Sequence, residues 1–65
     1  MVKNRLQELR WNREWTQAQL ALFSNVDRSL IGKIENTERP NPSVETALLL
    51  SRALGVSVEQ LFQIE

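Results

Sequence analysis

Helix-start signals recur along this chain and restrict it to short helices. The stretch "TQAQ" at residues 16–19 is a capping box, in which Thr16 caps the third helical residue and Gln19 reaches back to the cap. The stretch "SVEQ" at residues 57–60 repeats this pattern, and Ser43 is a third candidate N-cap. Apolar residues recur at helical spacing between these signals, and no run of residues is rich in strand formers. The sequence therefore predicts an all-α fold.

The same signals place the helix boundaries. We expect helices over about residues 4–13, 17–24, 28–36 and 44–54, and a short fifth helix that starts at Ser57. Asp27 is the expected N-cap of the third helix, and Gly55 ends the fourth. The prolines of "TERPNPS" exclude a helix there and predict a loop. Helices this short are stable only when packed on one another, so we expect a compact five-helix bundle, a single domain over residues 1–65.

Composition excludes several classes of function. The chain has no Cys and no His, so we expect no disulfide, no metal site and no cofactor. It lacks a glycine-rich phosphate loop and an inward pair of carboxylates, so we expect no enzyme activity. No apolar run approaches the ~18 residues of a membrane span, and the N-terminus has no signal-peptide core. We therefore expect a complete, cytoplasmic chain without a membrane partner.

Two charged residues lie beside apolar helix faces. Arg10 neighbours the Leu6 and Leu9 face of the first expected helix, and Glu35 neighbours Ile31 and Ile34 in the third. Because an unpaired charge is costly to bury, we predict that the two side chains form an ion pair that ties these helices together. The alternative is that each side chain extends to water separately.

The third expected helix has a basic outer face with small residues. Only about three residues, Asn25 to Asp27, separate it from the second helix, which predicts a sharp helix-turn-helix crossing. Burial of Ile31 and Ile34 leaves an outward face of Arg28, Ser29, Gly32, Lys33 and Asn36. In such a unit the second helix enters the major groove, where Arg and Lys bind guanine and small residues allow close approach to base edges. Taken alone, a short amphipathic helix with two basic residues is more often an ordinary solvated surface than a DNA-reading one, and the capped second helix, the tight turn and the basic loop that follows favour DNA.

The distribution of charge weakly favours a nucleic-acid partner. The formal net charge is zero, which by itself argues against one. Residues 1–43, however, carry seven basic and five acidic side chains, whereas residues 44–65 carry one basic and three acidic. The basic excess lies in the half that contains the third helix.

The longest motif, "TQAQLA…NVDRSLIGKIENTERPNPS…LSRALGVSVEQLF", resembles the phage repressor and Cro-type helix-turn-helix domain, often called the XRE family. The likeness covers about residues 5–62. Within this family "SNVDRS" is most similar to small controller proteins of restriction–modification systems. The ending "LFQIE" resembles compact repressors in which the two chain ends pair as strands. We therefore expect a sequence-specific transcriptional regulator that binds double-stranded DNA, as a repressor rather than an activator.

Position by position, the resemblance implies roles for individual residues. The base-reading positions are Arg28, Ser29, Gly32 and Lys33. The implied phosphate contacts are Thr16, Gln17, Asn36, Arg39 and Asn41, with Gln17 assisted by a helix N-terminus. Arg10 and Glu35 match the family's interhelical ion pair. The loop "NTERPNPS" is one residue longer than usual, and the family often has glycine in place of Glu14, Asn25 and Thr37.

Trp11, Leu22 and Leu49 are large apolar residues at positions that the family usually leaves polar. They indicate a surface for a protein partner, at Trp11 and Leu22 above all, or else scattered apolar residues that need no explanation. The alternative function is accordingly a protein-binding module, such as an antitoxin or adaptor with the same fold. RNA is a weaker candidate, because the sequence offers no aromatic stacking platform.

Dimerisation is expected from the small size of the reading surface. One recognition helix buries too little surface for specific affinity, whereas two copies on a two-fold axis read the half-sites of a palindrome. The stretch "VSVEQLFQIE" has more apolar groups than one short helix can bury. We predict a homodimer interface at Val58, Phe62 and Ile64. The alternative is that Phe62 fills the core of one monomer and that Ile64 pairs with Val2 as a strand.

Overall fold

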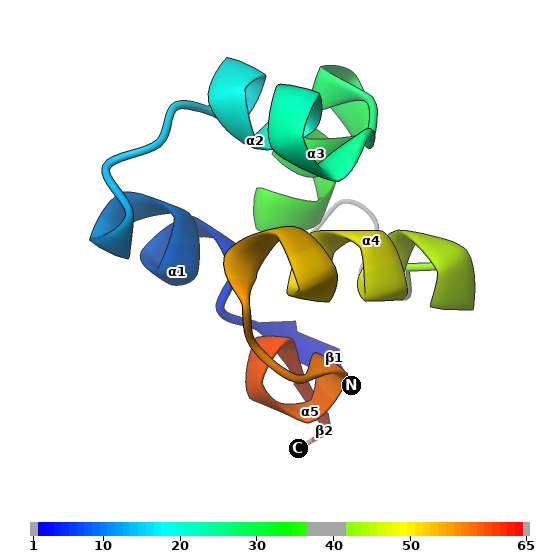
Figure 1. The fold of residues 1–65 in the computed structure, drawn as a ribbon. Coiled ribbons are helices and arrows are strands. Elements are labelled where there is room, and N and C mark those ends of the chain that lie inside the picture. The colour runs from blue at the N-terminus through cyan, green and yellow to red at the C-terminus, as the bar shows by residue number, and fades with distance from the viewer. Residues whose placement is uncertain (1, 37–41, 65) are drawn as a thin grey trace.

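The computed structural model describes residues 2–36 and 42–64, apart from the side chains of Val2 and Ile64. These residues form five helices and a two-stranded sheet, in the order β1 (Val2–Asn4), α1 (Leu6–Asn12), α2 (Gln17–Ser24), α3 (Arg28–Glu35), α4 (Val44–Leu54), α5 (Val58–Leu61) and β2 (Phe62–Ile64). α2 and α3 lie on one side of α4, and α5 and the sheet lie on the other (Figure 1). The predicted five-helix fold and the pairing of the chain ends are confirmed.

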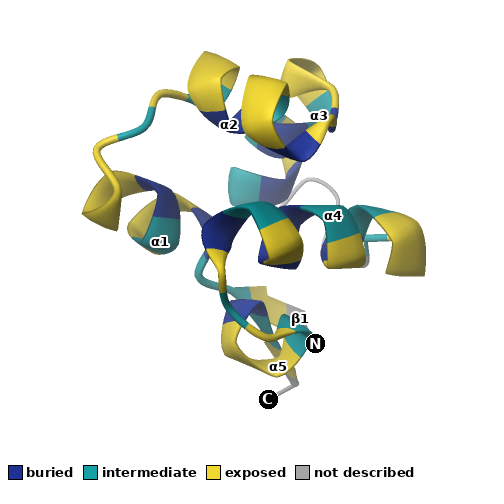
Figure 2. Ribbon diagram, viewed as in Figure 1, coloured by how far each residue is buried: buried dark blue, intermediate teal, exposed yellow. Residues whose placement is uncertain are grey.

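Every helix contributes to one apolar core. The buried members of this core are Leu6, Leu20, Val26, Ile31, Ile34, Leu50, Leu54 and Leu61. Trp15 and Phe62 are half-buried and pack against it. Figure 2 shows the buried faces turned towards the middle of the bundle and the exposed residues on the outer turns of α2 and α3. Burial of the inner faces is the main source of stability, because helices of this length are marginal alone.

The two predicted capping boxes are present. At α2, the Thr16 hydroxyl accepts a hydrogen bond from the Gln19 amide at 3.1 Å, and Oε1 of Gln19 accepts one from the Thr16 amide at 2.8 Å. Ser57 and Gln60 exchange the same pair of bonds at α5. Ser43 caps α4 by accepting from the Thr46 amide. These bonds satisfy donors that helix starts otherwise leave unpaired, which explains why the helices begin here.

The turn between α2 and α3 depends on two polar residues. Asn25 has a φ of 62°, the left-handed conformation that asparagine tolerates better than most residues. The buried Ser24 hydroxyl donates to the Leu20 carbonyl at 2.6 Å and accepts from the Val26 amide at 3.3 Å. The chain therefore reverses within three residues and places α3 across α2.

A two-point ion pair joins α1 to α3. Nε of Arg10 donates to Oε2 of Glu35 at 2.7 Å, and Nη2 of Arg10 donates to Oε1 at 3.0 Å. The two side chains are only 8% and 1% exposed, so neither extends separately to water. Nη1 of Arg10 also donates to the Trp15 carbonyl at 2.8 Å. The hydrogen bond to Glu35 raises the pKa of Arg10 above its ordinary value, against the opposing effect of burial.

Asn4 connects the terminal sheet to both α1 and α3. β1 and β2 are antiparallel, with Asn4 opposite Phe62. Oδ1 of Asn4 accepts from the Leu6 amide at 3.2 Å, and Nδ2 donates to the Ile34 carbonyl at 3.0 Å. The first helix was expected to start near residue 4, but it starts at Leu6 because the preceding residues pair as a strand.

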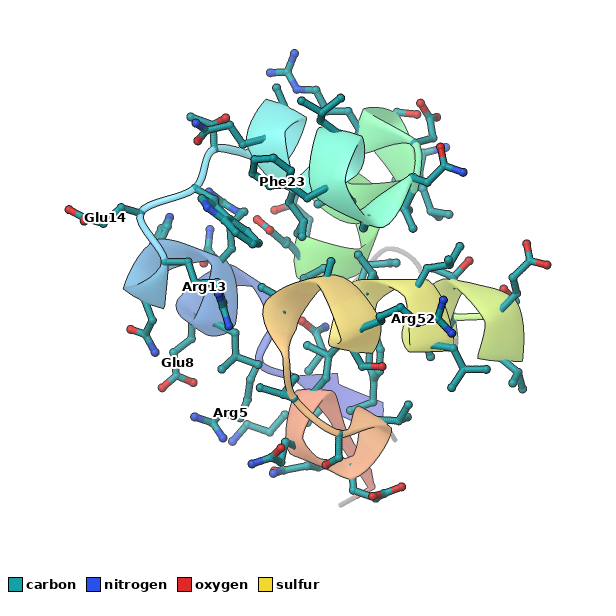
Figure 3. All side chains as sticks on the ribbon, viewed as in Figure 1. Arg5, Glu8, Arg13, Glu14, Phe23 and Arg52 are labelled. Carbon is teal, nitrogen blue, oxygen red and sulfur yellow. The ribbon has the colours of Figure 1, made fainter. Side chains whose placement is uncertain are left out.

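Arg13 and Glu14 shape the connection between α1 and α2. Nη2 of Arg13 donates to the Leu54 carbonyl at 2.8 Å, and its guanidinium carbon lies 5.2 Å from the centre of the Trp15 ring. Glu14 has a φ of 58°, which accounts for the glycine that the family often has at this position. Its side chain points away from the bundle, whereas Arg13 points towards α4 (Figure 3). Arg13 thus fastens this connection to the end of α4.

One expectation from the sequence is confirmed only in part, and another is wrong. Asp27 occupies the N-cap position of α3, but its side chain makes no capping bond to the helix and instead accepts from the Ser29 hydroxyl. Leu49 is half-buried and packs against the core, whereas Leu48 and Val44 are the exposed large apolar residues of α4. The face of α4 that packs against the core therefore includes Leu49.

We predict that Glu35→Ala lowers the free energy of unfolding by on the order of 3 kcal/mol, because it leaves the Arg10 charge buried without its partner. Chemical denaturation of Glu35→Ala, Arg10→Ala and the double variant measures the coupling energy. We also expect Glu35→Ala to weaken ligand binding by α3, which would lose its tie to α1.

The control variant is Glu8→Ala, which breaks the exposed Arg5–Glu8 pair at 2.8 Å. Its effect on stability should be small, since water screens this pair. Additive effects of Glu35→Ala and Arg10→Ala would show that the buried pair contributes no coupling energy.

Candidate nucleic-acid interface

The outer face of α3 carries two exposed basic side chains. Arg28 and Lys33 are exposed, and neither forms an ion pair or hydrogen bond with any residue that the structure describes. The opposite face of α3 holds Ile31 and Ile34, both fully buried. Glu35 belongs to the same helix but is paired with Arg10, so it does not neutralise the outer face. The geometry leaves positive charge available to a ligand.

Gln17 at the start of α2 lies beside the middle of α3. Its Nε2 donates to Oε1 of Glu35 at 3.1 Å, which joins it to the buried ion pair. A Cβ placed on Gly32 would lie 3.8 Å from Oε1 of Gln17. The structure therefore brings a predicted phosphate contact next to a predicted base-reading position, although the two are 15 residues apart in the chain.

Gly32 is not required by packing within the protein. The space beside it would accept a methyl group at ordinary van der Waals distance from Gln17. Its φ is not among the positive values of the chain, so its backbone conformation does not need glycine either. A glycine inside a helix lowers stability relative to alanine. Neither packing nor backbone conformation in the described residues thus requires glycine at this position.

The start of α2 has the features of a phosphate contact. Thr16 is exposed, and its hydroxyl oxygen accepts from the Gln19 amide while no described residue accepts the hydroxyl hydrogen. The first amides of a helix have no partner within the helix and favour an anion. Asn36 is exposed at the C-cap of α3. Arg39 and Asn41 lie outside the described residues.

Ser29 and Asp27 are both exposed at the start of α3, and the Ser29 hydroxyl donates to the Asp27 carboxylate. Sequence reasoning placed Ser29 on this surface but treated Asp27 only as a helix cap. The sequence does not show whether the Asp27 carboxylate bonds to a helix amide or to Ser29, because aspartate is a common N-cap residue.

Other candidate residues lie elsewhere on the bundle. Val58 and Phe62 are half-buried, and Phe62 packs against the core, while the Ile64 side chain is outside the described set. Trp11 is 60% exposed and Leu22 is 76% exposed. Phe23 is also 53% exposed, with its ring centroid 4.8 Å from that of Trp15. Sequence reasoning missed Phe23, which follows Leu22 directly in the chain.

The described residues contain no group of His, Cys, Asp and Glu side chains that could hold a metal ion. Within the same ranges, no helix has both the length and the apolar character needed to cross a membrane.

Comparison with known proteins reveals related regulators. The immunity repressor protein of Bacillus phage phi105 is 38% identical over 60 residues, which cover 92% of this chain and 41% of that protein. The uncharacterized HTH-type transcriptional regulator RghRB of Bacillus subtilis (strain 168) is 41% identical over 56 residues, which cover 86% of this chain and 40% of that protein. The chain thus spans about two fifths of the length of these curated relatives.

A solved structure agrees with these relatives. The restriction-modification controller protein C.AhdI from Aeromonas hydrophila superposes with a TM-score of 0.82 and 40% sequence identity, covering 89% of this chain and 86% of that one. A family model described as helix-turn-helix matches residues 6–61, from the start of α1 to the end of α5. The chain therefore belongs to the helix-turn-helix family, of the XRE type that includes phage repressors and restriction-modification controllers.

Proposed function

We propose that this protein is a sequence-specific transcriptional regulator that binds double-stranded DNA as a homodimer, with α3 in the major groove. The observation that carries the proposal is the outer face of α3. Arg28 and Lys33 are exposed there without partners among the described residues, on a helix whose inner face is fully buried. A rigid helix with free basic groups suits recognition of guanine edges. The named repressor and controller relatives support the same function, and repression is the mode we favour.

The residues divide by the part of DNA that they contact. Arg28, Ser29, Gly32 and Lys33 face the base edges. Thr16, Gln17, Asn36, Arg39 and Asn41 contact phosphates and set the position of α3 in the groove. Gln17 suits this role because the Glu35 carboxylate fixes its side chain beside Gly32. Phosphate contacts position a protein without reading sequence, so the two groups should respond differently to mutation.

A second copy of the chain completes the reading surface. An α3 of eight residues cannot supply specific affinity alone, whereas two copies about 34 Å apart read both halves of a palindromic operator. We place the dimer interface at Val58, Phe62 and Ile64, with Phe62 shared between the core and the interface. The half-burial of Val58 and Phe62 supports this placement, since both retain apolar surface that a partner could cover.

A protein-binding module is the second candidate function. The exposed Trp11, Leu22 and Phe23 favour it, because large apolar side chains on a small protein are typical of protein contacts. Salt dependence distinguishes the two functions. Binding to mixed-sequence DNA weakens steeply with salt when phosphates dominate, and a protein-binding module should bind such DNA poorly at any salt concentration.

Selection of bound DNA from a random double-stranded pool tests the proposed function. We predict that the wild type recovers a palindrome and that Arg28→Ala loses preference at one base position, at a cost of about 1–3 kcal/mol. Gln17→Ala and Arg39→Ala should weaken binding to all sequences alike. Equal loss of affinity for operator and scrambled DNA in Arg28→Ala would remove this residue from base reading.

Gly32→Ala should separate stability from binding. We predict that it raises the free energy of unfolding by about 0.5–1 kcal/mol, because alanine is the better helix former and the site has room for its methyl group. DNA binding should nevertheless weaken, because the added methyl group keeps the helix backbone away from the base edges. Thermal unfolding and binding anisotropy measure the two effects. Unchanged or tighter binding would show that close approach at Gly32 is not needed.

The dimer has its own test. We predict that sedimentation at micromolar concentration gives twice the chain mass of 7.5 kDa, and that Val58→Glu gives the monomer with its helical spectrum retained. Gln63→Glu is the matched control, since it adds the same charge at an exposed neighbour whose side chain alternates with Phe62 along the strand. If the wild type is a monomer in solution and still binds a palindrome, the two copies associate only on the DNA.

A further inference from the structure

Asp27 and Ser29, which precede and follow Arg28 in the sequence, are joined by a side-chain hydrogen bond. The Ser29 hydroxyl donates to Oδ2 of Asp27 at 2.5 Å, and both residues are exposed. The carboxylate makes no bond to an α3 amide, although it stands at the N-cap position. Among the described residues it has no basic partner either, and Oδ1 has no hydrogen bond. Ser29 therefore orients a carboxylate that the fold itself does not use for capping or pairing.

This pair offers a ligand only acceptor atoms. A carboxylate accepts hydrogen bonds and donates none, and a serine hydroxyl has a single hydrogen. That hydrogen is already given to Asp27, so Ser29 presents only lone pairs. The side chains of Asp27 and Ser29 thus match a ligand group that donates hydrogen bonds.

The major groove contains two strong base donors, N4 of cytosine and N6 of adenine. Adenine presents the acceptor N7 next to its amino group. The lone pair of N7 would face the lone pairs of Asp27 and Ser29, and that contact is unfavourable. Cytosine presents its amino group without such an acceptor. Guanine, thymine and the phosphates present acceptors, to which this pair has no hydrogen to donate. An acceptor-only pair therefore fits cytosine best.

We propose that Asp27, oriented by Ser29, accepts a hydrogen bond from the N4 amino group of a cytosine close to the guanine that Arg28 binds. This inference rests on the proposed function, because it requires α3 to lie in the major groove. A carboxylate on this surface weakens binding to phosphates at every site. The cytosine amino group compensates for that repulsion at matching sites only, so Asp27 increases discrimination rather than overall affinity.

A purely structural role for Asp27 makes a different prediction. A carboxylate at the start of α3 also stabilises the helix through its dipole. Replacement of Asp27 would then lower the melting temperature and weaken binding to all sequences equally. It would not change which bases are selected.

The test is selection from a random double-stranded pool with the wild type, Asp27→Ala, Asp27→Asn and Ser29→Ala. We expect the wild type to select cytosine near the position that Arg28→Ala disrupts. Asp27→Ala should lose preference at that cytosine alone. Asp27→Asn should select adenine instead, because an amide matches the N6 donor and N7 acceptor of adenine. Ser29→Ala should keep the preference for amino groups but discriminate less between cytosine and adenine.

Binding anisotropy with single-base variants of the selected site gives the magnitudes. Loss of the cytosine should weaken wild-type binding about tenfold and leave Asp27→Ala nearly unaffected. Glu59→Gln is the matched control, because it removes one exposed carboxylate near the start of another helix, in the first turn of α5. It should leave the selected motif unchanged.

The failures are distinguishable. In one outcome, Arg28→Ala disrupts the selected motif while Asp27→Ala and Asp27→Asn both select it unchanged. That result would overturn the cytosine contact but not the proposed function. A wild type that selects no motif would overturn both. Circular dichroism of each variant shows whether a loss of binding reflects unfolding.

Discussion

The buried ion pair between Arg10 and Glu35 holds the functional part of this molecule together. It ties α1 to α3 at two points, and Gln17 extends the same network to α2. A helix of eight residues with a glycine inside it has little intrinsic stability. Directional bonds to Glu35 therefore fix the rotation of α3 about its axis, which apolar packing of Ile31 and Ile34 alone specifies less tightly. The positions of the outer residues of α3 therefore depend on these bonds to Glu35.

Separation of the two faces of α3 explains how a chain with zero net charge can present a basic surface. Glu35 is neutralised inside the bundle, while Arg28 and Lys33 stay unpaired among the described residues. The inner face supplies the packing, so the outer face is free to carry residues that contribute little to stability. Gly32 and Asp27 both fit this division, since neither is explained by packing or capping within the monomer.

Sequence reasoning predicted the helices well where their signals are local. The capping boxes at Thr16 and Ser57 act within one turn, so their residues alone define the start of α2 and α5. The start of α1 could not be read in this way, because it depends on pairing with residues almost sixty positions later in the chain. The missing capping bond of Asp27 could not be predicted, for a different reason. Aspartate is common both as a helix cap and as an exposed surface residue. The two cases differ only in whether its carboxylate accepts from a helix amide or, as here, from the Ser29 hydroxyl.

Asn4 gives the terminal strands an influence on the end of α3. Its side-chain amide bonds to the Ile34 carbonyl, while its backbone lies opposite Phe62 in the sheet. Opening of the sheet would therefore remove a bond from the last turn of α3, so we expect local unfolding of the two segments to be coupled. Amide hydrogen exchange in that turn should rise whenever the strands separate and fall whenever they are held together. Exchange protection in the last turn of α3 should therefore report whether the terminal strands are paired.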